Sequence, residues 1–474
     1  MSSIHEECGV FGIFNRNREH DAAQETYLAL YALQHRGQVS CGIAVRNDQT
    51  VDCITEPGTV PDVFNKDKLA ALTANGKGDV ALGHVRYSAQ GEEDEINSQP
   101  MVMSYEKGSI SIANNGALVS TAKLRQKLES NGSVFQTNSN AEMIVHLIAR
   151  YRLNTQNIET AISQAMRELE GAYSFILMTP HKLIAVRDPK GFRPLCYGKL
   201  GDSYVIASES CAIQSIGGEF IRDIKPGEIL IITNEAVYSN TDNCGQKSAM
   251  CIFEHVYLAR PDSVIDGASV HRSRLNAGKF LAIEHPVEAD VVAGVPDSGI
   301  DAAIGYANQS GIPFGLGLIK NRYIGRTFIQ TTQKQRERSV QIKLNPLSNE
   351  IAGKRIVLVD DSIVRGTTCA KLIKKLRDAG AKEIHMRISS PPFINPCYFG
   401  TDISSKDKLI ACKLDIDEIC RFIGADSLGY LSLDSMMKVA ENSGVDFCSA
   451  CFTGDYPVDV TGENFVDKYS KKIT

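Results

Sequence analysis

Val359-Asp360-Asp361-Ser362-Ile363-Val364-Arg365-Gly366-Thr367-Thr368 joins an apolar strand to the start of a helix. In an open α/β sheet, ligands bind at this carboxyl end of the strands. Backbone N–H groups of the helix start and the two threonine hydroxyls can hold a phosphate, and Gly366 lets the backbone approach it. The acids Asp360 and Asp361 can accept hydrogen bonds from ribose hydroxyls or bind Mg²⁺. The stretch therefore predicts a phosphate-binding loop, against the alternative of a capped turn with a structural role only.

Two strand–helix–strand units make up this region. Residues 290–320 read as strand, loop, helix and strand, and residues 354–392 repeat that order with a longer loop. In the second unit Leu372, Ile373 and Leu376 fall on one face of the helix, and Gly380 suits its end. This pattern predicts a parallel sheet.

The first half of the chain has a different pattern. Short apolar or alternating segments such as ECGVFGIF and DVALGHVRY predict strands, and apolar residues at helical spacing predict helices over 121–129 and 141–151. A polar stretch, residues 239–250, marks a boundary. We therefore expect an α+β domain over residues 8–240 and an α/β domain over residues 241–474, preceded by a short segment, residues 1–7.

The composition limits the partners. The 474 residues include 51 basic and 56 acidic side chains, and the net charge of −5 gives no global attraction for nucleic acid or an anionic membrane. No apolar run approaches the roughly 20 residues that span a bilayer, and the first residues resemble no targeting signal. We expect a cytoplasmic protein that binds neither nucleic acid nor membrane.

Two other segments suit an anionic ligand. The segment 294–299, Gly-Val-Pro-Asp-Ser-Gly, ends the earlier strand and can cradle pyrophosphate with Mg²⁺ near Ser298, or form a plain tight turn. The basic segment 320–328, which includes Lys320, Tyr323 and Arg326, can be a solvated face or a flap that closes over the ligand and excludes water.

The stretch 359–368 resembles the motif of type I phosphoribosyltransferases that binds 5-phosphoribosyl-1-pyrophosphate (PRPP). The resemblance implies that the two acids hold the ribose and that the turn after them holds the 5-phosphate. It places Mg²⁺ at Ser298, Asp360 and Asp361. The implied PRPP-binding residues are Asp360, Asp361, Ser362, Arg365, Gly366, Thr367, Thr368, Lys320, Tyr323 and Arg326.

Cys8 stands at the head of a predicted strand, in Glu6-Glu7-Cys8-Gly9-Val10-Phe11-Gly12. One interpretation is a cysteine that is simply buried there. If residues 1–7 are a propeptide that is removed, Cys8 instead carries both its thiol and a free α-amino group. The reference pKa of such an amino group, about 7.7 to 8.0, suits a general base at neutral pH. Processing would then create a nucleophile.

Three motifs follow Cys8: His35-Arg36-Gly37-Gln38, Gly83-His84-Val85-Arg86-Tyr87 and Asn114-Asn115-Gly116. Their order resembles that of amino-terminal-nucleophile glutamine amidotransferases. With the phosphate loop, the chain from Cys8 to about Pro457 is similar to the glutamine PRPP amidotransferase family. The resemblance implies an α+β glutaminase domain, with stacked antiparallel sheets between helices, followed by an α/β phosphoribosyltransferase domain with a parallel sheet.

The resemblance also implies a reaction. Cys8 attacks the side-chain amide of glutamine, Asn115 and Gly116 stabilise the oxyanion, and Arg86 holds the α-carboxylate. The ammonia that leaves crosses a channel, with Tyr323 near its junction, and displaces pyrophosphate from PRPP. The product is 5-phosphoribosylamine, formed at the first committed step of purine synthesis.

The glutamine pocket departs from the family pattern at four residues. Asn140 replaces the aspartate that binds the α-ammonium, Asn114 and Ala117 replace His and Asn, and Ala89 replaces Thr. The loss of one charge-assisted hydrogen bond costs about 1.5 to 3 kcal/mol, or roughly 10- to 100-fold in affinity. Three functions stay open: a transferase that uses glutamine, a transferase that uses ammonia or another amine donor, and a PRPP-sensing regulator.

Four of the 13 cysteines form a candidate metal site: Cys448 and Cys451 in a CxxC pair, with Cys251 and Cys397. The pair alone is compatible with zinc or redox chemistry, and four thiolates with zinc or iron–sulfur. The cluster-containing branch of the family has cysteines in these contexts and binds a [4Fe–4S] cluster. That branch is homotetrameric and inhibited by purine nucleotides, which we expect here too. The cysteines expected to be buried packing thiols are Cys41, Cys53, Cys196, Cys211, Cys369 and Cys412.

Overall fold

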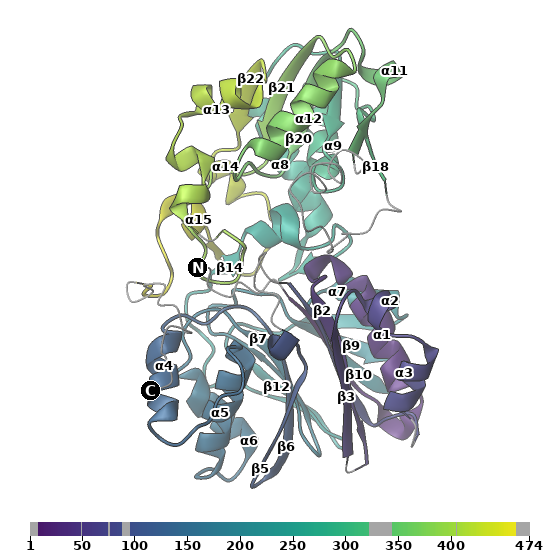
Figure 1. The fold of residues 1–474 in the computed structure, drawn as a ribbon, viewed down its shortest axis with the longest axis vertical. Helices are drawn as coiled ribbons and strands as arrows, with labels where there is room; N and C mark the ends of the chain where they lie inside the picture. Colours follow the sequence, from purple (N-terminus) through teal and green to yellow (C-terminus); the bar gives the residue numbers. More distant parts are fainter. Residues whose placement is uncertain are drawn as a thin grey trace.

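The computed structural model describes residues 8–48, 50–73, 76–87, 95–321, 344–403 and 405–460. The chain forms two parts that lie one above the other in Figure 1, with the amino-terminal part below and the carboxyl-terminal part above. Over the described residues, none of the helices is both long enough and apolar enough to cross a membrane.

The lower part is a sandwich of two sheets whose neighbouring strands are antiparallel. One sheet has the order β11-β9-β10-β1-β4-β2-β3, and the other has the order β13-β12-β8-β7-β6-β5. The strands of the first sheet are β1 (Gly9–Phe14), β2 (Ser40–Asn47), β3 (Thr50–Pro57), β4 (Val80–Arg86), β9 (Cys196–Leu200), β10 (Ser203–Ala207) and β11 (Glu219–Asp223). Those of the second are β5 (Met101–Tyr105), β6 (Gly108–Asn115), β7 (Ser174–Met178), β8 (Leu183–Arg187), β12 (Ile229–Ile232) and β13 (Val237–Asn240).

Helices cover both outer faces of this sandwich (Figure 1). The first sheet packs against α1 (Ala22–Ala32), α2 (Val60–Val63), α3 (Lys66–Leu72) and α7 (Ser210–Ser215), and the second against α4 (Thr121–Glu129), α5 (Asn140–Arg152) and α6 (Ile158–Met166). Between the sheets, Val10 and Leu82 of one meet Ala113 and Ile176 of the other. The predicted stacked antiparallel sheets between helices are confirmed, as are the helices expected near 121–129 and 141–151.

The upper part is built on a parallel sheet of order β17-β20-β21-β22. Its elements are β14 (Met250–Cys251), the π-helix η4 (Glu254–Leu258), β15 (Val264–Ile265), β16 (Ala268–Ser269), α8 (Val270–Glu284), β17 (Val291–Gly294), α9 (Gly299–Ser310), β18 (Leu318–Lys320), β19 (Leu344–Pro346), α11 (Ser348–Ile351), β20 (Arg355–Asp360), α12 (Thr367–Asp378), β21 (Glu383–Ile388), α13 (Ile416–Ile423), β22 (Ser427–Tyr430), α14 (Leu433–Met436), β23 (Phe447–Cys448) and α15 (Ala450–Thr453). Short 3₁₀ turns lie at Arg16–Arg18, Gln34–Arg36, Glu95–Asn97, Lys406–Lys408 and Ile410–Cys412.

The second predicted strand–helix–strand unit, β20, α12 and β21, lies in the parallel sheet. The first is present only in part, because β17 lies in that sheet whereas β18 pairs antiparallel with β19 in a separate two-stranded sheet. In α12, Leu372, Ile373 and Leu376 are buried as expected, and Gly380 follows the helix end with a φ of +97°. Helices α8 and α9 cross so closely that a Cβ at Gly278 would lie 1.8 Å from the Ala302 carbonyl oxygen. Only a glycine fits at this crossing. This packing fixes α9, whose start flanks the phosphate loop.

A buried ion pair joins the two parts. Arg187, at the end of β8, donates two hydrogen bonds of 2.8 Å to Asp266, in the turn between β15 and β16. Burial, together with the Asp266 charge, raises the pKa of the nearby Asp223 carboxyl to about 7. The positive charge of Arg187 therefore acts on three carboxyl groups, those of Asp266, Asp223 and Asp188.

We expect Asp223→Asn to flatten the dependence of stability on pH. The folded state keeps this proton up to about pH 7, whereas an ordinary aspartate loses it near 3.8, so raising the pH across this interval favours the unfolded state. The wild type should lose stability from about pH 4 to about pH 7, and the variant should lose less. Melting temperatures across this range test the prediction, with exposed Glu235→Gln as the control. Identical slopes in wild type and Asp223→Asn would contradict it.

Candidate active sites

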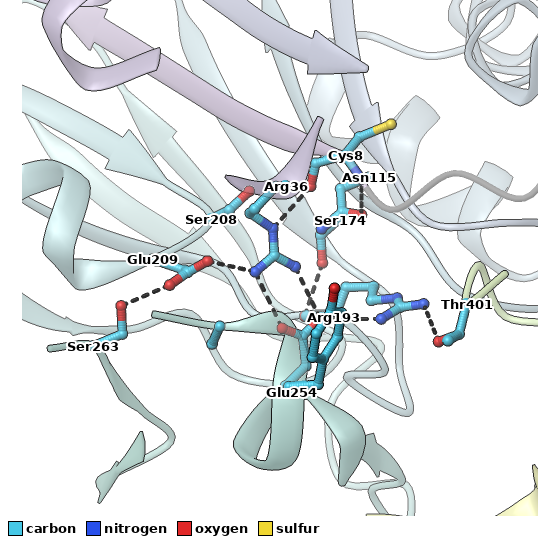
Figure 2. Close-up of polar contacts among 12 residues, drawn as sticks. Cys8, Arg36, Asn115, Ser174, Arg193, Ser208, Glu209, Glu254, Ser263 and Thr401 are labelled. Atoms are coloured by element: carbon cyan, nitrogen blue, oxygen red, sulfur yellow. Dashed lines mark hydrogen bonds and ion pairs between the residues drawn. The ribbon is translucent and has the colours of Figure 1, made fainter. Parts of the chain in front are cut away.

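Cys8 lies buried at the head of β1, with both main-chain groups held. Its N–H donates to Asn115 Oδ1 at 3.2 Å, and its carbonyl accepts a hydrogen bond of 3.0 Å from Arg36 Nε. Figure 2 shows the Cys8 sulfur pointing away from Arg36. The surroundings therefore fix the backbone of this residue.

Asn115 and Gly116 form a candidate oxyanion site beside Cys8. The Asn115 Nδ2 group is buried and has no hydrogen-bond partner among the described residues, while its Oδ1 accepts from Cys8. Gly116 has a φ of +128°, and a Cβ there would lie 2.5 Å from the Ala172 carbonyl oxygen. A buried amide donor with no partner of its own is suited to an anionic oxygen that develops during reaction.

The two predicted glutamine-binding residues lie on different elements: buried Arg86 ends β4, and buried Asn140 begins α5. The carboxylate nearest to Asn140 in sequence is engaged elsewhere, because Glu142 accepts hydrogen bonds from Gln136 N–H (2.8 Å) and from the Thr137 N–H and hydroxyl (both 2.7 Å). Burial alone would raise the pKa of Glu142, but these hydrogen bonds and one from His146 lower it to about 2. Ala117 is buried, and Ala89 lies outside the described residues.

A buried charge network begins at Arg36 and crosses into the upper part (Figure 2). Arg36 Nη1 and Nη2 donate to Glu254 at 3.1 and 2.9 Å, and Nη1 also donates to Glu209 at 2.6 Å. Glu254, on η4, accepts a further hydrogen bond of 3.0 Å from Arg193. Burial opposes the charge of Glu254, but Arg36 and Arg193 lower its pKa. The main chain of Cys8 is thus tied to the second domain through four charged side chains, those of Arg36, Glu209, Glu254 and Arg193.

Sequence reasoning did not assign a role to Glu209, Glu254 or Arg193, although a signal existed. Glu209 stands among small residues and Glu254 directly follows the apolar Ile252 and Phe253, and buried charges occur mainly in pairs. The missing information was which arginine meets which acid.

The phosphate loop joins β20 to α12, and two of its neighbours meet it. Asp361 accepts hydrogen bonds of 2.5 Å from Ser298 and from Ser362, which links the segment 294–299 to the loop. Burial raises the pKa of both Asp360 and Asp361, and the Asp361 charge raises that of Asp360 further. Two adjacent carboxyl groups, one half-buried at Asp360 and one buried at Asp361, fit a cation such as Mg²⁺.

The start of α12 faces outward. Gly366 precedes the helix with a φ of +74°, and Arg365, Thr367 and Thr368 are exposed. Lys320, at the end of β18, forms an ion pair with Asp297 in the segment 294–299. Tyr323 and Arg326 lie outside the described residues, as do residues 1–7.

All four cysteines of the predicted cluster site line one cavity. Cys251 and Cys448 are register partners in the parallel pair β14 and β23, and Cys397 and Cys451 complete the set. Phe192, Phe399 and Thr401 also line the cavity, and Arg193 donates to the Phe399 carbonyl at 3.1 Å and to the Thr401 hydroxyl at 3.1 Å. The cysteine cavity therefore shares a wall with the charge network.

The four thiols match the ligand number of an iron–sulfur cluster and line one cavity. Burial raises the pKa of Cys251 to about 11 and raises that of Cys448 and Cys451 as well, so thiolates there need a strong positive partner. Within the described ranges, no group of three or more His, Cys, Asp or Glu side chains is arranged to hold a metal ion. Of the six cysteines expected to be buried, Cys53 and Cys412 are exposed, which corrects that expectation.

Known proteins share both parts of this chain. Residues 84–215 match the glutamine amidotransferase domain family, and residues 274–389 match the phosphoribosyl transferase domain family. The amidophosphoribosyltransferase of Methanothermobacter thermautotrophicus is 46% identical over 98% of this chain and 97% of its own length. That of Bacillus subtilis is 45% identical over 97% of this chain and 96% of its own. A structure of the B. subtilis glutamine PRPP amidotransferase, complexed with ADP and GMP, has a TM-score of 0.87 and 45% identity, covering 96% of this chain and 98% of that one.

The fold and the two sites define a glutamine amidotransferase domain joined to a phosphoribosyltransferase domain. With relatives of such identity over nearly its whole length, the chain belongs to the amidophosphoribosyltransferase family.

We expect Glu254→Gln to lower both stability and glutamine-dependent activity. The change leaves Arg36 and Arg193 buried without their shared carboxylate, and breaking a buried charge pair from one side costs about 3 to 5 kcal/mol. Thermal unfolding and a glutamine hydrolysis assay measure the two effects. Asp262→Asn, which breaks the exposed pair with Arg260, is the control and should cost less than about 1 kcal/mol. Equal melting temperatures for both variants would contradict the role of Glu254.

Proposed function

We propose that the protein makes 5-phosphoribosylamine, pyrophosphate and glutamate from PRPP, glutamine and water, the first committed step of purine synthesis. The observation that carries the proposal is the buried network from the Cys8 carbonyl through Arg36 to Glu254, which connects the nucleophile with the domain that holds the phosphate loop. A glutaminase domain that had lost its activity would not need a buried network that holds the backbone of Cys8 in place.

The proposed glutaminase step uses residues of the first domain. Removal of residues 1–7 frees the α-amino group of Cys8, which takes the thiol proton and passes it to the leaving nitrogen. The sulfur bonds to the amide carbon, ammonia leaves, and water then releases glutamate. The partnerless Asn115 Nδ2 and the Gly116 N–H hold the oxyanion, Arg86 binds the α-carboxylate, and Asn140 faces the α-ammonium.

The proposed transfer step takes place at the second domain. Ammonia attacks C1 of PRPP and pyrophosphate leaves. Residues 365–368 hold the 5-phosphate at the helix start, and Lys320, Tyr323 and Arg326 cover the ligand. When bound at Ser298, Asp360 and Asp361, Mg²⁺ supplies positive charge beside the leaving pyrophosphate. We also propose a cytoplasmic homotetramer inhibited by purine nucleotides, in keeping with the ADP and GMP bound to the B. subtilis relative.

Pyrophosphate release distinguishes this function from its alternatives. We expect release from PRPP with glutamine or with ammonia, and we expect Cys8→Ala to abolish only the glutamine-dependent reaction, because the transfer site is separate. Amino-terminal sequencing of protein purified without oxygen should begin at Cys8. Cys53→Ala, which removes an exposed thiol of the same domain, is the matched control.

Other outcomes would favour the other functions. Release with ammonia alone, in wild type and Cys8→Ala alike, would favour a transferase with an altered glutaminase pocket. No release with either donor would favour a PRPP-sensing regulator. Undiminished glutamine-dependent release by Cys8→Ala would overturn the proposed nucleophile.

We further propose that Cys251, Cys397, Cys448 and Cys451 hold a [4Fe–4S] cluster that supports the charge network through their shared wall. Protein purified without oxygen should contain about four iron and four sulfide per chain. Cys448→Ser should lose iron and lower the melting temperature, because buried thiols are left without the cluster. The exposed Cys412→Ser, in the same domain, should keep its iron. Full iron content in Cys448→Ser would contradict the site.

A further inference from the structure

Asn114 lies where the strand ladder beside β6 ends. The pairing of β5 with β6 runs from Tyr105 opposite Gly108 to Met101 opposite Ile112, two residues short of Asn114. Main-chain groups of alternate residues in a strand point to the same side. The N–H and C=O of Asn114 therefore point along the side on which β5 no longer reaches them.

Two side chains take the place of the missing strand. The Asn114 N–H donates to Gln99 Oε1 at 2.8 Å, and the Asn114 carbonyl accepts a hydrogen bond of 3.1 Å from His84 Nε2. His84 belongs to β4 of the opposite sheet, so its ring bridges the two sheets. All three residues are fully buried, where an unmade hydrogen bond is costly.

The hydrogen bond fixes the state of the imidazole ring. A carbonyl oxygen only accepts, so Nε2 carries the hydrogen. Burial lowers the pKa of His84 to about 3, and the nearby Arg86 charge acts in the same direction, so the ring is neutral at pH 7. A neutral donor at this place adds no charge beside the oxyanion site.

Asn115 and Gly116 follow Asn114 directly, and their positions depend on its backbone. The side-chain amide of Asn115 must keep Oδ1 on the Cys8 N–H while Nδ2 points into the reaction site. We infer that His84 and Gln99 are positioning residues that fix Asn114 and thereby aim the oxyanion donors of Asn115 and Gly116. The inference rests on the proposed glutaminase activity, and it assigns no contact between these two residues and glutamine.

Two substitutions at His84 separate positioning from packing. In His84→Gln the amide nitrogen can take the place of Nε2, whereas in His84→Asn it falls short. A misplacement of about 1 Å in a catalytic group costs roughly 100-fold. We therefore expect His84→Asn to lower kcat for glutamine hydrolysis by about 10- to 100-fold, with the KM for glutamine within about 2-fold of wild type, and His84→Gln to stay within about 3-fold in both. Gln99→Met, which removes the acceptor at similar volume, should resemble His84→Asn.

Two controls show that the rest of the protein is intact. Ammonia-dependent pyrophosphate release should be unchanged in all three variants. Iodoacetamide should alkylate Cys8 in each variant at the wild-type rate, measured by mass spectrometry, since alkylation needs no oxyanion site. An equal loss with ammonia and glutamine, or wild-type kcat in His84→Asn, would overturn the inference while the proposed function stands. No glutamine hydrolysis by the wild type would overturn the proposed function, and the inference with it.

Discussion

The carboxylate of Glu254 is the constraint on which the arrangement of the two domains depends. It lies buried between Arg36 and Arg193, which both belong to the first domain. Arg36 also donates a hydrogen bond to the carbonyl of Cys8. Charges in such surroundings persist only when every one has its partner. Glu254 follows Cys251 by three residues, and Arg193 binds the carbonyl of Phe399, two residues after Cys397. Cys8, the domain boundary and the cysteine cavity therefore share one set of interactions.

The two acids of the phosphate loop in the second domain, Asp360 and Asp361, have different surroundings. Asp360 and Asp361 lie at the carboxyl end of a central strand, because β20 pairs with β17 on one side and β21 on the other. Asp361 accepts hydrogen bonds from the hydroxyls of Ser298 and Ser362, and Asp360 accepts one of 2.9 Å from the Asp361 N–H. Glu209 and Glu254 form direct ion pairs with Arg36, whereas Asp361 is hydrogen-bonded to hydroxyls, with the charge of Arg274 nearby. This contrast separates charge used for structure from charge available to a ligand.

The sequence predicted the parts of the fold that depend on local patterns. The parallel sheet and α12 followed from apolar periodicity and from glycines at turns, and α4 from helical spacing. The contacts between Arg36, Glu209 and Glu254 could not be predicted, because residues that lie far apart in the chain make them. The exposure of Cys53 and Cys412 was missed for a related reason: an apolar segment does not tell which of its faces the sheet or helix buries.

The departures in the glutamine pocket affect two separable properties. Asn114 contributes through its main chain, whose N–H and carbonyl meet Gln99 and His84, so an asparagine there leaves these two contacts in place. Its side chain adds a longer hydrogen bond of 3.3 Å to the Gly116 carbonyl. Asn140 differs, because a neutral amide cannot replace the charge of a carboxylate, and Glu142 is committed to its own loop. The departure at Asn114 therefore leaves its main-chain contacts in place, whereas the departure at Asn140 removes a charge from the predicted glutamine pocket.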